Sequence, residues 1–255
     1  MFYNPMSAAP TQVRAWLEAA ERLLHEGELG GLMLHIENPM ALSSEEEAVI
    51  DLVDKYLKEH GQQGIATVAN TIFPASLDRG DGIEGLRARY LAVYAKRMCR
   101  QGGWGRYFER MVHWETRDRG HVDQIAENIR MLRQLRADGA WNYKQCYEIA
   151  LFDPARDLIK PRGRQCLSFI ELKPALDGQL HMMAVYRNHH YVARTLGNLI
   201  GLGRLQQFIA QEAGFTLGTL TIQSTHAELD LAGGRKREVQ TLIAACRTAL
   251  LTQAA

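Results

Sequence analysis

The sequence predicts an α/β fold in one domain that spans residues 1–255. Two observations support this prediction. Segments in which apolar residues recur at helical spacing alternate along the chain with short apolar runs of the kind found in strands. A length of 255 residues is ordinary for a single α/β domain and allows a sizeable core. The sequence contains no internal repeat or low-complexity tract that would indicate another architecture.

The charge balance argues against several classes of partner. Lys and Arg total 30 and Asp and Glu total 29, so the formal net charge is +1. This predicts no nucleic-acid or membrane surface, and an anionic ligand must be met by local groups. No apolar run approaches the ~18–20 residues that cross a bilayer. The cysteines lie far apart without a C-x-x-C pair, so we expect free thiols in a cytoplasmic protein: Cys99, Cys146, Cys166 and Cys246.

The first 60 residues predict two helices around a strand. Apolar residues in 11–26 fall on one face of a helix, and residues 31–37 are apolar enough for a short strand. Ser44 and Glu47 have the spacing of a capping box before a helix over 48–60.

The middle of the chain predicts one more strand and then helices. Residues 64–74 are rich in β-branched side chains and end at Pro74, which predicts a strand followed by a loop. Residues 83–98 and 121–136 have apolar side chains at helical spacing and predict two helices.

The last third predicts a hairpin, a buried helix, a strand and a final helix. Cys166 precedes an apolar run, a turn with Asp177 and Gly178 follows, and a second apolar run leads to Arg187. Asn198 opens the next helix. The segments after it alternate as a strand over 216–231 and then become amphipathic over 237–251. A lone Cys beside a strand is usually a small buried hydrophobe, so spacing alone does not make Cys166 a nucleophile.

The order of three residues in this last third carries a resemblance to a known family. Cys166, then Arg187, then Asn198 eleven residues later resembles thymidylate synthases and their pyrimidine hydroxymethylase relatives. Three other stretches agree in the same order, and together they cover roughly residues 102–230: GGWGRYFERM, HVDQIAENIRML and STHAEL. The resemblance implies a large mixed β-sheet flanked by helices, and a homodimer that forms through a sheet face.

The resemblance also implies roles for individual residues. Cys166 would be the nucleophile that adds to C6 of a pyrimidine nucleotide, and Arg187 its electrostatic and phosphate partner. A thiol with an ordinary pKa of ~8.5 needs positive charge nearby to ionise. Asn198 would read the base, and an amide there favours uracil over cytosine because it can donate to O4 and accept from N3–H. His226 resembles the family's sugar contact.

Other candidates for substrate binding surround these residues. The resemblance adds six positions to the pocket: Asn188, His190, Arg164, Lys144, Tyr107 and Trp104. The family's pair of phosphate-binding arginines, which crosses the dimer interface, has no counterpart before the nucleophile. The nearby basic candidates are Lys144, Arg156, Lys160, Arg162 and Arg164. A loop arginine, Arg79, and the pair Asn70 and Thr71 are weaker candidates.

The chain departs from the family pattern where the second substrate binds. The family's pterin-binding Asp is His190 here, its sugar-binding Tyr is Glu228, and its C-terminal tail has no counterpart. Residues 1–83 also diverge. Methylenetetrahydrofolate is therefore a candidate cofactor whose pterin-binding features are degenerate. We expect no metal site, because His189 and His190 would point to opposite faces of a strand.

Three classes of function stay open. The first is methyl or hydroxymethyl transfer to C5 of a pyrimidine nucleotide. The second is Cys166 chemistry on another nucleoside or natural-product intermediate. The third is a nucleotide-binding protein without catalysis. Retention of Cys166 argues against the third, and loss of the pterin contacts argues against folate in the first.

Overall fold

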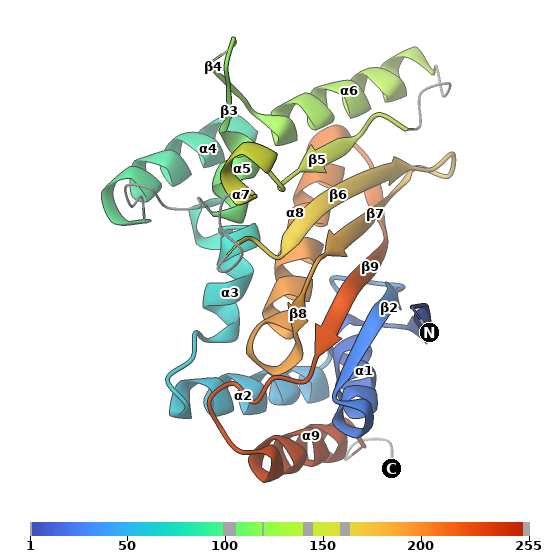
Figure 1. The fold of residues 1–255 in the computed structure, drawn as a ribbon. Coiled ribbons are helices and arrows are strands. Elements are labelled where there is room, and N and C mark those ends of the chain that lie inside the picture. Colours follow the sequence, from blue (N-terminus) through green and yellow to red (C-terminus); the bar gives the residue numbers. More distant parts are fainter. Residues whose placement is uncertain (1, 99–105, 119, 140–144, 159–163, 252–255) are drawn as a thin grey trace.

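The computed structural model describes residues 2–98, 106–118, 120–139, 145–158 and 164–251. Its centre is a seven-stranded mixed sheet in the order β1-β2-β9-β7-β6-β5, with β8 paired to the end of β9 (Figure 1). The β1–β2, β7–β9 and β8–β9 pairs are parallel and the other pairs are antiparallel. The strands are β1 (Asn4–Ala9), β2 (Glu28–Ile36), β5 (Glu148–Ala150), β6 (Leu167–Pro174), β7 (Gln179–Tyr186), β8 (His189–His190) and β9 (Thr216–Glu228).

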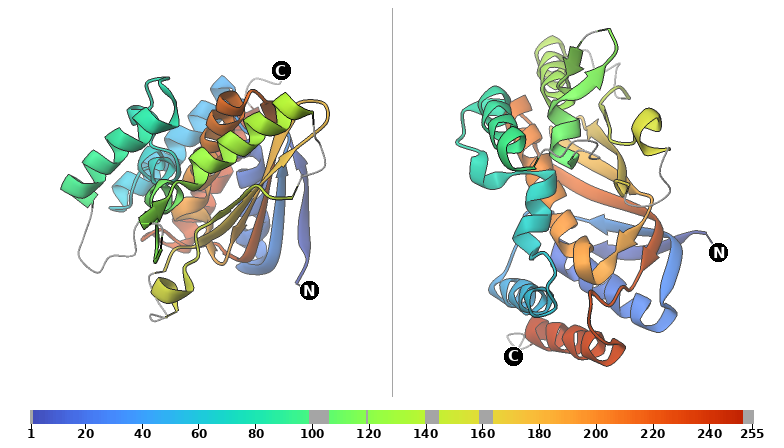
Figure 2. Two further views of the ribbon diagram at one scale, coloured as in Figure 1. Left: turned by 90° about the horizontal axis from the view of Figure 1, so that it is seen from above. Right: turned by 60° about the vertical axis from the view of Figure 1, so that its left-hand side comes forward.

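Helices flank this sheet, so the expected α/β class with a large mixed sheet is confirmed. Cyan α3, teal α4 and orange α8 lie on the same side of the strands (Figure 2). The helices are α1 (Gln12–Glu26), α2 (Ser44–Glu59), α3 (Ile65–Ile72), η1 (Ala75–Leu77), α4 (Gly82–Val93), η2 (Tyr94–Met98), α5 (Tyr107–Val112), α6 (Gln124–Asp138), α7 (Pro154–Asp157), η3 (Tyr191–Thr195), α8 (Leu196–Ala213) and α9 (Lys236–Leu251). A small hairpin, β3 (Trp114–Thr116) with β4 (Gly120–Val122), precedes α6.

The close contact between α3 and α8 depends on two glycines of α8. A Cβ atom at Gly197 would lie 2.7 Å from the Cβ atom of Val68, and one at Gly201 would lie 2.7 Å from the carbonyl oxygen of Ala69. Any larger side chain at either position would push the helices apart. This contact places α3 beside the first turn of α8, which contains Asn198 (Figure 1).

The structure corrects the prediction for residues 64–74, which form helix α3 and not a strand. The buried residues Ile65, Val68, Ala69 and Ile72 follow helical spacing, and they pack against α8. Tertiary burial of this face outweighs the β propensity of the branched side chains. Asp54 Oδ1 also accepts the Ile65 N–H at 2.8 Å, at the start of the helix.

Two element boundaries also differ from the prediction. The capping box before α2 is made by Ser43 and Glu46, one residue earlier than expected. Helix α6 begins at Gln124, because the residues before it pair in β4. The helices predicted for 11–26 and 83–98 are confirmed, as are the 166–187 hairpin and the final strand and helix. Within the described ranges, no helix combines the length and apolarity needed to cross a membrane.

Candidate active site

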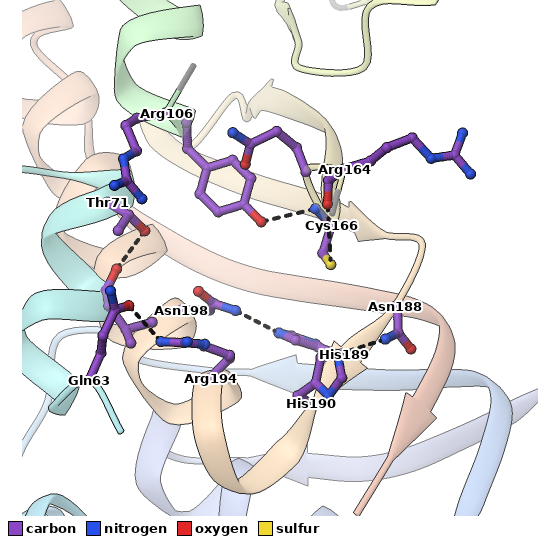
Figure 3. A pocket seen from close by; sticks show the side chains of 13 residues that line it. Gln63, Thr71, Arg106, Arg164, Cys166, Asn188, His189, His190, Arg194 and Asn198 are labelled. Carbon is purple, nitrogen blue, oxygen red and sulfur yellow. Dashed lines mark hydrogen bonds between the residues drawn. The ribbon is translucent and has the colours of Figure 1, made fainter. Parts of the chain in front are cut away.

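A cavity of about 360 Å3 opens where β6, β8, α3 and α8 come together (Figure 3). The structure gathers many of the residues expected from the sequence around it. Six of them line its wall: Tyr107, Arg164, Cys166, Asn188, His190 and Asn198. Arg187 and His226 lie behind that wall and not on it. Trp104 and Lys144 lie outside the described residues, as do Lys160 and Arg162.

Cys166 stands immediately before β6, and its backbone is held from two sides. The N–H groups of Cys166 and Leu167 both donate to the Tyr107 hydroxyl oxygen, at 3.0 and 3.2 Å. The Cys166 carbonyl accepts the Arg187 N–H at 2.9 Å across the β6–β7 hairpin. The partly buried thiol therefore faces the cavity from a backbone that is fixed by hydrogen bonds.

Arg187 holds the two residues before Cys166 through its guanidinium group. Its Nε donates to the Gln165 carbonyl and its Nη2 to the Arg164 carbonyl, both at 2.9 Å. These bonds fix the two residues before Cys166. Contact of Arg187 with a phosphate stays a prediction, because the guanidinium group does not line the cavity in this structure.

The charge environment of Cys166 contains opposing contributions. Burial raises the pKa of the Cys166 thiol above its ordinary value, and the Arg187 and Arg194 charges lower that pKa without overcoming burial. The Glu228 carboxylate raises it further. Arg187 thus acts in the expected direction, but the free site favours the thiol over the thiolate.

Asn198 is oriented by a histidine. Its Nδ2 lies 3.2 Å from Nε2 of His189, whose Nδ1 lies 3.0 Å from the Ser224 hydroxyl. Burial, followed by the His190 charge, lowers the pKa of His189 to about 3, so the ring is neutral. With Nδ2 as donor, Nε2 is the acceptor and Nδ1 carries the proton. The Asn198 carbonyl oxygen then points away from His189 (Figure 3).

Two guanidinium groups supply positive charge to the cavity. Arg194 donates to the Gln63 amide oxygen at 2.6 Å. The Arg106 guanidinium group lies beside Thr71, and within the described part of the chain it has no hydrogen bond or ion pair (Figure 3). The Arg164 side chain instead extends away from this group of residues (Figure 3).

The remaining basic candidates for phosphate binding lie elsewhere. Arg156 forms ion pairs with Glu115 and Asp153, and it does not line the cavity. Arg79 and Asn70 are not in the cavity wall either, whereas Thr71 is.

A connected polar cluster forms one side of the site. His190 Nδ1 lies 3.1 Å from Glu228 Oε1, and Asn188 Nδ2 lies 3.0 Å from His190 Nε2. The Asn188 carbonyl oxygen lies 2.6 Å from His226 Nδ1, and His226 Nε2 lies 3.2 Å from Glu28. His190 and Glu228, which replace two residues of the family pattern, are thus each other's partners.

Comparison with known proteins finds two partial similarities. No protein-family model matches the chain. A protein of Methanothermobacter thermautotrophicus named "Putative thymidylate synthase" is 29% identical over 113 residues, which cover 42% of this chain and 45% of that protein. One of the same name from Methanosarcina barkeri is 24% identical over 123 residues, which cover 48% of this chain and 51% of that protein. The chain spans about half the length of the curated relatives it matches. These similarities support a thymidylate-synthase-like relationship, and the mixed α/β fold is consistent with it.

Several cavity residues could not be found from the sequence pattern. Val68 was hidden by the strand prediction for α3, whereas Thr71 had been a weaker candidate. Arg194 faces the cavity because of the way in which η3 packs, and no motif marks it. Arg106 lies in the stretch GGWGRYFERM, which resembles a segment of the family, but it was not among the predicted site residues. His189 was considered only as a metal ligand. In the described part of the chain, no three His, Cys, Asp or Glu side chains gather in a group that could hold a metal ion.

Proposed function

We propose that this protein is a thymidylate-synthase-like enzyme that acts on C5 of a pyrimidine nucleotide through a covalent adduct with Cys166. The observation that supports it best is the composition of the cavity wall. A thiol, an amide and two guanidinium groups line one cavity: Cys166, Asn198, Arg106 and Arg194. The named relatives support the same class of function.

The chemistry requires a nucleophile and a group that stabilises the charge it creates. The Cys166 thiolate forms a bond to C6, the C5–C6 double bond opens, and its electron pair moves toward the C4 carbonyl oxygen. C5 then attacks a one-carbon electrophile and afterwards loses its proton. Finally the C6–S bond breaks and the thiolate leaves. Electrostatic stabilisation of the developing negative charge lowers the barrier. An N–H of Asn198 at O4 would supply this stabilisation.

The orientation of Asn198 supports a uracil base. Its carbonyl oxygen, turned away from His189, is an acceptor for N3–H of uracil. Cytosine has a lone pair and no proton at N3. Its N3 and the Asn198 carbonyl oxygen would therefore be two acceptors with no proton between them. Arg106 and Arg194 are the groups that we propose for the phosphate, because guanidinium groups bind it with two parallel hydrogen bonds.

The proposal includes a homodimer that forms through the face of the sheet that α3, α4 and α8 leave open (Figure 2). Half-buried apolar side chains on that face support it, among them Phe169, Met183 and Val185. In the resembled family, arginines of the partner subunit complete the phosphate site, which would add to the charge of Arg106 and Arg194.

The wall does not match the way in which the resembled family holds a folate. The position of the pterin-binding carboxylate holds the His190 imidazole, which is already engaged with Glu228 and Asn188. We therefore derive no step through methylenetetrahydrofolate. The same contact favours a second candidate function, in which Cys166 performs its chemistry on another nucleoside or natural-product intermediate.

Intact-protein mass spectrometry with 5-fluoro-dUMP and 5-fluoro-CMP, each with and without methylenetetrahydrofolate, tests the proposal. A C5 fluorine cannot leave as a proton does, so a productive adduct persists. Wild type, Cys166→Ala and the matched thiol control Cys146→Ala are compared, since Cys146 does not line the cavity.

Each outcome of this experiment has a separate meaning. A gain of nucleotide plus folate that Cys166→Ala abolishes and Cys146→Ala retains supports the proposed transfer. Cys166-dependent labelling without folate supports the second candidate. Nucleotide binding without any adduct, unchanged by Cys166→Ala, overturns both and leaves a non-catalytic nucleotide-binding protein.

A further inference from the structure

A second and larger cavity lies between helices α1, α2, α3 and α8. Its volume is about 490 Å3, within the range of ~300–1,000 Å3 that is usual for small-molecule sites. Helices α3 and α8 contribute to both cavities, but through different residues, and no residue lines both. Nothing in the proposed chemistry at Cys166 uses this second cavity, so its ligand has to be inferred from its own wall.

Most of this wall is apolar. Helices α1, α2, α3 and α8 contribute branched side chains, and the loop after β2 adds two more apolar residues. The members are Val13, Ile50, Ile65, Ile200, Met40 and Leu42. Met40 and Leu42 are exposed to solvent and form the rim. Such a wall favours the apolar body of a ligand over water, because burying apolar surface is favourable.

One side chain in this wall is a cation that has no partner among the described residues. Arg204 extends from α8 into the wall and is partly buried. Burial lowers its pKa, yet a guanidinium group keeps its charge at all ordinary pH values. Among the described residues, no hydrogen bond or ion pair to its side chain occurs. Taking a charge out of water without a partner is costly, and an anion at Arg204 would offset that cost.

The acidic residues of the wall do not satisfy Arg204. Asp54 is already engaged, since it pairs with Lys58 and accepts the Ile65 N–H at 2.8 Å. Glu47 and Asp51 belong to α2 and are exposed. Their negative charges at the solvent side repel a dianion such as a phosphate monoester more strongly than a singly charged group.

We propose that this cavity binds a small apolar molecule with a single carboxylate, and that Arg204 holds the carboxylate. A guanidinium group matches a carboxylate with two parallel N–H···O bonds, so this pairing is specific as well as attractive. The site is independent of the function proposed for the Cys166 cavity.

Titration calorimetry with octanoate tests the proposal, with octan-1-ol and octylamine as neutral and cationic probes of the same chain length. Wild type is compared with Arg204→Met, which keeps an unbranched apolar stem and a similar helix propensity but removes the charge. Arg237→Met is the matched control, because Arg237 is exposed and does not line the cavity. Ala66→Trp fills the cavity from an exposed position of α3. Thermal melting confirms that each variant is folded.

We expect octanoate to bind more tightly than either other probe. Arg204→Met should weaken octanoate binding by about tenfold or more, because it removes a charged hydrogen-bonding partner. Ala66→Trp should abolish binding, while Arg237→Met and Cys166→Ala should bind as wild type does. The proposal is overturned if octanoate fails to bind at millimolar concentration, or if octanol binds equally well and Arg204→Met changes nothing. Loss of binding in Cys166→Ala would instead place octanoate in the other cavity, and would also overturn it.

Discussion

The proposed preference for uracil is expected to depend on a residue that need not touch the base. His189 accepts a hydrogen bond from Asn198 Nδ2, and so determines which end of the amide faces the cavity. His189→Phe removes this acceptor. The substitution keeps an aromatic ring in the stack with Tyr186, where the ring centroids lie 4.0 Å apart at an interplanar angle of 10°. The altered property is therefore the orientation of Asn198 rather than the packing around it.

The size of the effect follows from one hydrogen bond. In the wild type, a cytosine base has two unfavourable alternatives. Its N3 lone pair can face the Asn198 oxygen with no proton between them. Otherwise the Asn198 amide must turn, which places its oxygen against the Nε2 lone pair of His189. Leaving a buried polar group unpaired costs about 1–3 kcal/mol, which is roughly 5- to 150-fold in affinity. In His189→Phe the amide turns freely, so the ratio of cytidylate to uridylate dissociation constants should fall toward one.

Calorimetric titration of dUMP, UMP, dCMP and CMP into both proteins measures this ratio. Ser224→Ala is the control, since it removes the Nδ1 partner of His189 and leaves Nε2 in place. It should give a smaller change than His189→Phe. Wild-type protein that prefers cytidylate would refute the orientation of Asn198. A ratio unchanged in His189→Phe would show that something other than His189 sets the preference.

The same substitution changes the pH dependence of stability. The folded-state pKa of His189, about 3, lies below its ordinary value of 6.5. Between these values the unfolded chain binds a proton that the folded chain does not, so stability falls as the pH falls through that window. The slope is about 1.4 kcal/mol per pH unit, or about 2 kcal/mol between pH ~6.5 and ~5. Urea unfolding at several pH values should show this loss in the wild type and not in His189→Phe.

Three further predictions concern the support of the site. Arg110→Met should cost about 3–5 kcal/mol in urea unfolding, because it leaves the Asp157 carboxylate buried and unpaired where both side chains are 1% exposed. The double variant with Asp157→Leu should recover most of this, and no recovery would contradict the explanation. Tyr107→Phe should lose about 1–3 kcal/mol of stability and slow the reaction of Cys166, because two backbone N–H groups lose their acceptor. An alkylation rate equal to that of wild type would argue against this positioning role. Glu228→Gln should lower the pKa of the Cys166 thiol, since the carboxylate raises it, and peptide mass mapping of iodoacetamide labelling against pH should show the shift to lower pH.

The sequence predicted those elements in which the local pattern and the tertiary environment agree. The hairpin that carries Cys166 has two apolar runs and a turn at Asp177 and Gly178, and both features are local. Helix α3 was predicted wrongly because its β-branched composition was weighed above its spacing. Ile65, Val68, Ala69 and Ile72 stand at i, i+3, i+4 and i+7, which is a helical pattern.

The site was predictable only for residues whose order along the chain resembles that of a known family. Cys166 and Asn198 meet in the cavity as their order suggested. The direction in which a long side chain points was not predictable, because it depends on contacts between elements that are distant in sequence. The Arg187 guanidinium group donates hydrogen bonds to the carbonyls of Arg164 and Gln165. The Arg106 side chain instead reaches the cavity from the start of α5.

The two departures from the family pattern at positions 190 and 228 are best understood as one change. His190 and Glu228 sit 3.1 Å apart, and each satisfies part of the other's hydrogen-bonding capacity. A carboxylate at position 190 beside Glu228 would place two like charges in contact, and a tyrosine at position 228 beside His190 would remove the carboxylate partner of the imidazole. Neither position can return to the family residue alone without a cost. His190 and Glu228 therefore form a self-consistent pair in which each residue depends on the other.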